Sequence, residues 1–221
     1  MAIGPKLKWI KSNLEDKIYL IALLVISILL SILIVKNFSS NFLINTILIS
    51  SAFYLFFITL RDFFNKGFKN LAQNTAHFGF SLLILSILFN NLFSTETITN
   101  LKVGETFENA KTKIIFENIS QKEEKNYKSI IAKFIIQDSK GKIDNLSPEL
   151  RIYNQPNTVT SEADIKTTLL SDKFIVINLL PNQELFNVRY QVKPFMLWIW
   201  ISVILISVGG LMSFLKKEYE K

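Results

Sequence analysis

Residues 70–95 read NLAQNTAHFGFSLLILSILFNNLFST and contain no Lys, Arg, Asp or Glu. Three further stretches, residues 18–35, 37–60 and 194–215, are equally free of these residues. Each stretch is long enough to cross roughly 30 Å of hydrocarbon as an α-helix. We therefore expect a membrane protein with transmembrane helices at about residues 18–35, 38–60 and 71–93 and a fourth within residues 194–221.

A polar segment, residues 96–193, separates the third and fourth apolar stretches and is large enough to fold as a small domain. It contains short runs of β-branched and aromatic residues separated by polar turns, a pattern typical of β-strands. The expected fold class is four transmembrane helices with a small β-rich extracytoplasmic domain inserted between helices 3 and 4. We expect strands at 111–119, 129–138, 150–153, 173–180 and 185–192, turns at 138–142 and 181–184, and a short helix at 161–170.

Six units of the formal charge of +7 come from residues outside the polar segment, beside the apolar stretches. The polar segment holds 14 basic and 13 acidic residues, which leaves 11 basic and 5 acidic residues elsewhere. This distribution gives no reason to expect nucleic-acid binding. By the positive-inside rule, the basic flanks face the cytoplasm, so both termini are expected there and residues 96–193 on the opposite side. The basic flanking residues are Lys6, Lys8, Lys11, Lys17, Arg61, Lys66, Lys69, Lys216, Lys217 and Lys221.

The sequence lacks the residues that several classes of chemistry require. The sequence has no cysteine, which excludes disulfides and thiol chemistry by this chain. The polar segment has neither histidine nor cysteine, and its carboxylates are scattered among lysines. We therefore expect no catalytic residues in this chain and a domain that is stabilised by its own β core.

His77 is the only histidine and lies inside the third apolar stretch. An ionisable residue within a membrane is a candidate functional site. One possibility is a haem-iron ligand, because iron takes a neutral imidazole nitrogen within an apolar pocket. The alternatives are an imidazole that hydrogen-bonds a neighbouring Ser or Asn, and a proton relay, which would usually need further ionisable groups at membrane depth.

Small residues near His77 and in the fourth stretch are a second feature. Gly79 and Ser81 are expected to leave room for a flat ring beside His77. Gly209 and Gly210 are expected to allow another helix to approach closely. A haem held by two histidines would need its second ligand from another polypeptide, since Met196 and Met212 are expected to be packing residues.

Ordered sequence blocks resemble the CcmF-type haem lyase subunits. The segment AHFGFSLLILSI at 76–87 resembles the helix in which that family carries a histidine before a glycine-bearing apolar run. Residues 148–153, 161–165 and 171–176 resemble its PEKRxY, TEAxI and RDLYV blocks, and 188–200 its VRxYxKPFxxWIW block. Residues 2–9 are similar to an interior GPLLxW segment, so the chain resembles the C-terminal third of a longer family and looks split or truncated.

The resemblance implies a role in cytochrome c maturation (system I) in the bacterial inner membrane, with residues 96–193 periplasmic. It implies that His77 is one axial ligand of a transmembrane haem b, and that the chain belongs to the complex that attaches haem covalently to apocytochrome c. The implied partners are the remaining portion of the split lyase, a thiol-handling maturation subunit, a haem chaperone, apocytochrome c and membrane lipid. Alone, the chain would not be an active lyase.

Two other hypotheses are compatible with the sequence. The chain could be a non-catalytic membrane scaffold in which His77 only packs, or a four-span haem exporter and lyase of the other maturation system. The second would need a larger domain and another membrane histidine. The sequence departs from the family blocks within the β domain and at its boundary, at Leu150, Ser161, Lys173 and Leu197. The charged residues of these blocks are expected to hold the β domain together.

Overall fold

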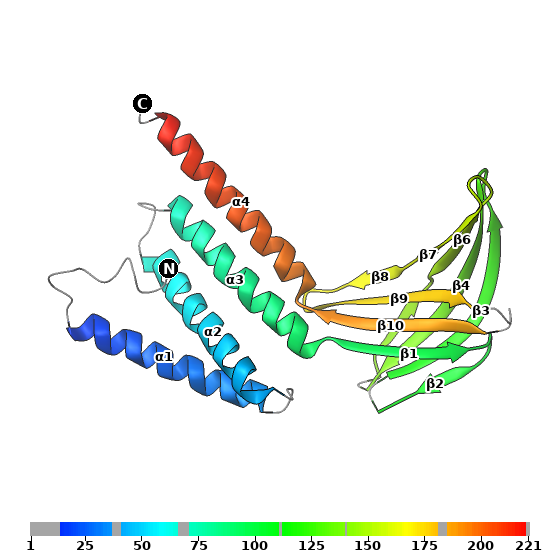
Figure 1. Cartoon of the computed structure of the whole chain (residues 1–221), viewed down its shortest axis with the longest axis horizontal. Helices are drawn as coiled ribbons and strands as arrows, with labels where there is room; N and C mark the ends of the chain where they lie inside the picture. Colours follow the sequence, from blue (N-terminus) through cyan, green and yellow to red (C-terminus); the bar gives the residue numbers. More distant parts are fainter. Residues whose placement is uncertain are drawn as a thin grey trace. The chain divides into compact units, whose positions relative to one another are not determined.

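The computed structural model describes residues 14–36, 41–65, 71–110, 112–139, 141–180 and 185–219. The chain divides into two compact units, a helical unit of residues Met1–Phe93 with Pro194–Lys221 and a β unit of Ser94–Lys193 (Figure 1). The expected fold class is confirmed: four apolar helices are present, and the β-rich unit is inserted between the third and the fourth.

The helices are α1 (Leu14–Val35), α2 (Phe42–Asn65), α3 (Leu71–Phe93) and α4 (Met196–Tyr219). Each contains a segment long and apolar enough to cross a membrane. The second helix differs from the expected 38–60 because it extends past Arg61 and Asp62. The Arg61 guanidinium lies 4.1 Å from the ring centroid of Tyr19 on α1, a cation–π contact that accommodates its charge at the helix end.

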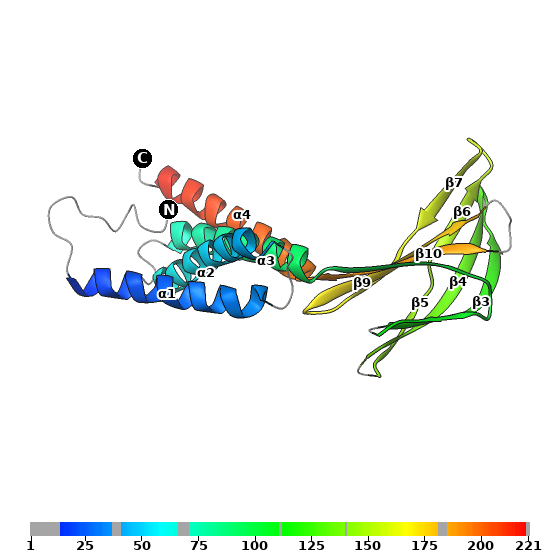
Figure 2. The same cartoon turned by 60° about the horizontal axis from the view of Figure 1, so that its bottom comes forward.

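The β unit is a sandwich of two antiparallel sheets (Figure 2). We name the four-stranded sheet, in the order β1-β10-β9-β8, sheet A, and the other, in the order β2-β3-β4-β6-β7 with β5 paired to β4, sheet B. The strands are β1 (Thr95–Leu101), β2 (Thr106–Glu108), β3 (Thr112–Glu123), β4 (Tyr127–Asp138), β5 (Ile143–Leu146), β6 (Glu149–Tyr153), β7 (Thr158–Glu162), β8 (Asp164–Thr167), β9 (Ser171–Leu179) and β10 (Phe186–Pro194).

The expected helix at 161–170 is wrong. Thr158–Glu162 forms β7 and pairs with β6, and Asp164–Thr167 forms β8 and pairs with β9. A capping pattern at Ser161 and Asp164 suggested a helix, but the serine lies opposite Leu150 in a sheet and the Asp164 carboxylate accepts a hydrogen bond from the Ser147 backbone N–H. Cross-strand pairing therefore overrides the local helix signal.

The turn expected at 138–142 is present between β4 and β5. The Lys142 backbone N–H donates to the Asp138 side chain at 2.9 Å, and Gly141 takes the left-handed conformation (φ 78°) that glycine favours. Strands β1, β2 and β5 were not expected from the sequence. The turn expected at 181–184 lies outside the described residues.

Aromatic side chains from both sheets fill the core of the sandwich. Phe116 on β3 stacks on Phe134 of β4 with ring centroids 4.4 Å apart, and meets Phe186 of β10 edge-on at 5.5 Å. All three are buried within one hydrophobic cluster. Burial of this apolar surface stabilises the unit without any disulfide.

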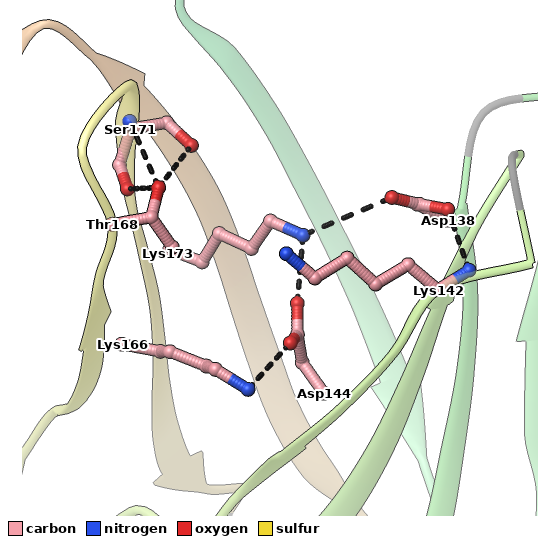
Figure 3. A network of polar contacts seen from close by, with 7 residues as sticks. All are labelled: Asp138, Lys142, Asp144, Lys166, Thr168, Ser171 and Lys173. Atoms are coloured by element: carbon pink, nitrogen blue, oxygen red, sulfur yellow. Dashed lines mark hydrogen bonds and ion pairs between the residues drawn. The ribbon is translucent and has the colours of Figure 1, made fainter.

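A buried carboxylate also joins the two sheets. Asp144 on β5 is 1% exposed and lies 2.7 Å from the ammonium of Lys166 on β8 and 2.7 Å from that of Lys173 on β9 (Figure 3). Burial alone would raise the pKa of Asp144, but the hydrogen bonds and charges of the two lysines outweigh it and hold the pKa below its usual value. The ionised carboxylate thus links sheet B to sheet A.

We expect Asp144→Ala to destabilise the β unit by about 3 kcal/mol, because Lys173 would be left buried without its main partner. The matched control is Glu123→Ala, which removes an exposed ion pair with Lys128 and should cost less than about 0.5 kcal/mol. Denaturant unfolding of the detergent-solubilised chain, followed by hydrogen exchange of the β strands, measures both. Equal destabilisation by the two substitutions would contradict the linking role of Asp144.

The lowered pKa of Asp144 also predicts how the stability of the β unit depends on pH. A carboxylate whose folded-state pKa lies below its unfolded value stabilises the fold above the unfolded pKa, and this contribution is lost as the pH falls through the folded pKa. We therefore expect acid to weaken the β unit of the native chain more steeply than that of Asp144→Asn. Parallel pH titrations of unfolding stability should show this difference in slope, and identical slopes would rule it out.

Candidate functional site

The candidate site lies on α3, whose orientation is fixed by two neighbouring helices. Figure 1 shows α3 running beside both α2 and α4. Residues three or four positions apart lie on the same side of a helix, so α3 can present separate faces to the two neighbours. The contacts of each face show where His77 lies.

One face of α3 packs closely on α4 through small residues. A Cβ at Gly79 would lie 2.9 Å from the Leu205 Cβ and 3.0 Å from the Ser202 carbonyl oxygen. On α4, a Cβ at Gly209 would lie 2.6 Å from the backbone nitrogen of Ala76 on α3. These distances are too short for any side chain, so both positions require glycine for the helices to approach this closely.

A second face of α3 packs on α2 through hydroxyl, amide and aromatic side chains. Ser81 is fully buried, and its hydroxyl lies 2.6 Å from that of Thr59. The Asn74 side-chain N–H donates to the Asp62 carbonyl at 3.1 Å. The Phe78 ring contacts two rings of α2, those of Phe56 and Phe63.

His77 lies at the border between the α2 face and a third side of α3. Asn74 and Ser81, three and four positions from it, face α2. Gln73, Phe80 and Ile84 lie on its other side and form the third side together with it. Gln73 is exposed, Phe80 is 40% exposed, and His77 and Ile84 are half-buried. This third side is the face of α3 that α2 and α4 leave uncovered, and we call it the outer face.

The imidazole of His77 has no hydrogen-bond partner among the residues that the structure describes. The nearby Ser81 hydroxyl bonds Thr59 and the Phe78 carbonyl, and the Asn74 amide bonds Asp62. The alternative of an imidazole held by a neighbouring Ser or Asn therefore finds no support in the described part of the chain.

The expected room for a flat ring beside Gly79 and Ser81 is a wrong prediction. Gly79 is buried against α4 and Ser81 against α2, so the space that their small side chains leave is filled by protein. Phe80 and Ile84, which sequence reasoning did not single out, share the face of His77 instead. Helical spacing alone could have placed them there, but not the partners of the other faces.

The described residues suit one side of a haem and no more. His77 offers a single nitrogen ligand, beside the apolar side chains of Phe80 and Ile84. No group of three or more His, Cys, Asp or Glu residues that could hold a metal ion occurs in the described ranges. Because the sequence has no other histidine, a second imidazole ligand must come from residues outside it.

Gly209 and Gly210, expected together to allow a helix contact, differ in the structure. Gly209 lies against Ala72 and Ala76 of α3, whereas a Cβ at Gly210 would have no atom within 4 Å. Only the first glycine is needed for packing. This pair provides an internal control for the helix contact.

We expect Gly209→Ala to weaken the contact between α3 and α4 by about 1–3 kcal/mol, because the added methyl group forces backbone shifts in a close-packed interface. Gly210→Ala should leave stability unchanged or raise it slightly, since alanine favours helix and meets nothing there. The thermal midpoint of the solubilised chain distinguishes the two. A lower midpoint for Gly210→Ala than for Gly209→Ala would contradict the observed orientation of α4.

Arg151 and Arg189, two charged residues of the family-like blocks, are paired within the β unit. The Arg151 Nε donates to Glu149 at 3.1 Å, and its guanidinium lies 5.2 Å from the ring centroid of Tyr127. Arg189 on β10 pairs with Glu96 on the adjacent strand β1. These contacts agree with the expectation that the charged residues of the blocks hold the β domain together.

The chain is similar to known proteins in sequence and in fold. Residues 92–194 match the family described as CcmF C-terminal beta-sandwich. The cytochrome c-type biogenesis protein CcmF of Pseudomonas aeruginosa is 24% identical over 172 residues, covering 72% of this chain and 26% of the relative. That of Escherichia coli K12 is 22% identical over 231 residues, covering the whole chain and 36% of the relative.

A solved structure titled Cytochrome c Heme Lyase CcmF matches the fold with a TM-score of 0.68 and 19% identity. The match covers 95% of this chain and 36% of the solved chain. The chain thus spans about a quarter to a third of the length of these relatives. The match extends the likeness from the β unit to the helices.

Proposed function

We propose, on the premise that this chain corresponds to the C-terminal portion of a CcmF-type protein, that it acts in cytochrome c biogenesis as part of a haem lyase. In this proposal His77 is one axial ligand of a haem b within the membrane. The second axial ligand comes from residues outside this sequence. The chain holds no catalytic residues of its own and is not active alone.

The observation that carries the proposal is the place of His77. Its imidazole lies on the outer face of α3, half-buried and without a hydrogen-bond partner among the described residues. A polar ring in a membrane-spanning helix is costly unless something binds it. A haem approaching the outer face would meet this nitrogen together with Phe80 and Ile84.

When bound, a haem at this position would supply one-electron chemistry, and the chain's own residues would hold it in place. His77 would bind the iron through one imidazole nitrogen. Phe80 and Ile84 would contact the macrocycle and exclude water from that side. The packing of Gly79 on α4 and of Ser81 on α2 would fix the direction in which His77 points.

The proposal includes a membrane topology. The lysine-rich flanks support cytoplasmic N and C termini in a bacterial inner membrane, with the β unit in the periplasm. There the β unit would dock the other components of the system: the remaining portion of the lyase, a thiol-handling subunit, a haem chaperone and apocytochrome c. Its paired charges support a docking role better than a catalytic one.

The test is His77→Gly in the chain co-expressed and purified with the rest of its complex. We expect the absorption bands of the b-type haem to be lost and the yield of cytochrome c to fall at least tenfold, the scale on which loss of a metal-site partner is felt. Added imidazole should restore the haem bands, because it replaces the missing ligand without restoring a packing contact.

The matched control is Ser207→Ala on α4, an exposed serine whose hydroxyl donates to the Val203 carbonyl of its own helix at 2.9 Å. This variant should keep its haem bands. Retention of an unchanged haem spectrum by His77→Gly would show instead that the chain is a membrane scaffold whose histidine binds no haem. Loss of haem by His77→Gly with no effect of imidazole would show that His77 acts only through the packing of α3.

A further inference from the structure

Two leucines stand out at the turn between β8 and β9 of the β unit. Leu169 is 62% exposed and Leu170 is 63% exposed, and they occupy the two central positions of the turn Thr168–Ser171. The turn is closed by hydrogen bonds: the Thr168 backbone N–H donates to the Ser171 carbonyl at 3.0 Å, and the Thr168 hydroxyl donates to the same carbonyl at 2.7 Å. The leucines are therefore presented by a well-defined turn.

Two other turns of the β unit carry polar residues at their tips. The turn between β3 and β4 contains Glu124, Lys125 and Asn126, and that between β6 and β7 contains Asn154, Gln155 and Asn157. Two adjacent leucines at an exposed tip are costly in water, since apolar surface is left unburied. The turn between β1 and β2 also exposes an apolar residue, Val103 at 47%, but only this turn among those described places two adjacent leucines at its tip. The pair indicates an apolar environment there.

The strand order places the leucine turn at a particular end of sheet A. Strand β10 runs to Pro194, and β1 begins at Thr95, opposite Val192 of β10. The neighbouring strand β9 is joined to β10 by a hairpin in which the Leu180 N–H donates to the Leu185 carbonyl. Because the hairpin is antiparallel, β9 begins at the end of the sheet where β10 finishes and β1 starts.

This is the end of the sheet at which the chain enters and leaves the β unit. A single residue, Ser94, separates α3 from β1, and a single residue, Phe195, separates β10 from α4. Since a residue spans at most about 3.6 Å, the start of β1 and the end of β10 each lie within a few ångströms of the end of an apolar helix that can cross a membrane. The leucine turn projects from the same edge.

We infer that the turn Thr168–Ser171 is a lipid anchor, with Leu169 and Leu170 inserted into the interfacial layer of the bilayer that α3 and α4 cross. Insertion at the headgroup level buries apolar side chains that water would otherwise surround. The hydrogen bonds of the turn already satisfy backbone groups, which lowers the cost of entering a less polar layer.

The charges beside the turn are paired within the β unit. Figure 3 shows a polar cluster next to Thr168 and Ser171 in which the ammonium groups of Lys166 and Lys173 meet the carboxylates of Asp138 and Asp144. Lys142 joins the cluster through its backbone N–H, which donates to Asp138. The inference therefore rests on the apolar side chains of the turn and not on charge. This inference needs only that α3 and α4 span the bilayer, and it does not depend on haem binding by His77.

The chain contains no cysteine, which allows a clean test by single-site labelling. A fluorophore is attached to Thr167→Cys, an exposed position beside the turn, in the full chain reconstituted into vesicles of phosphatidylethanolamine and phosphatidylglycerol. We expect quenching by lipids that carry a nitroxide near the headgroup, and protection from acrylamide in the water. The matched control is the same label at Val159→Cys on β7, a position 61% exposed that should remain open to acrylamide.

The leucines themselves are tested by adding Leu169→Ser and Leu170→Ser to the labelled chain. Loss of each leucine should shift the ratio of lipid-exposed to water-exposed probe toward water on the order of tenfold, the effect of burying one such side chain. Adding Val159→Ser instead should change nothing. If the label at 167 is as open to acrylamide as that at 159, or is protected only after another protein is added, the lipid anchor is wrong.

Discussion

The close approach of α3 and α4 is the constraint on which the helical unit depends. In lipid no hydrophobic force drives helices together, so association relies on contacts at short distance. Gly79 and Gly209 permit such contacts because neither carries a side chain between the two backbones. Once α4 occupies one face of α3 and α2 occupies another through Thr59 and Ser81, the rotation of α3 is fixed. The direction of His77 is thus decided by residues that never touch a ligand.

The β unit is stabilised by different forces. Its core of aromatic and aliphatic side chains gains stability from exclusion of water, which the membrane-spanning helices do not share. One ionised group, Asp144, is retained inside this core region and is matched by lysines from the opposite sheet. A buried ion pair adds less net stability than an apolar contact of the same size, but removing one partner is costly. Asp144 therefore restricts how the two sheets can pair.

The sequence predicted what depends on long, continuous patterns. Charge-free stretches predicted the four helices, and short runs of β-branched and aromatic residues predicted the β-rich insertion. The secondary-structure prediction failed where a tertiary contact decides between helix and strand. At residues 161–170 the capping pattern is overridden by pairing with β6 and β9. His77 could be singled out because it is costly in a membrane, but the partners of Gly79 and Ser81 could not, because spacing along a helix does not identify the neighbour on each face. The room assigned to a ring beside them is therefore occupied by α4 and α2.

The insertion of the β unit between α3 and α4 has a consequence for synthesis of the chain. The ribosome must add roughly a hundred residues after α3 before α4 emerges, which takes about 5–20 s at ordinary translation speeds. During that interval the small-residue face of α3, with Ala76 and Gly79, lacks the helix that later covers it. The newly made chain consequently passes through a stage in which α3 lies in the membrane without α4. The later helix, α4, then completes the contact that orients His77.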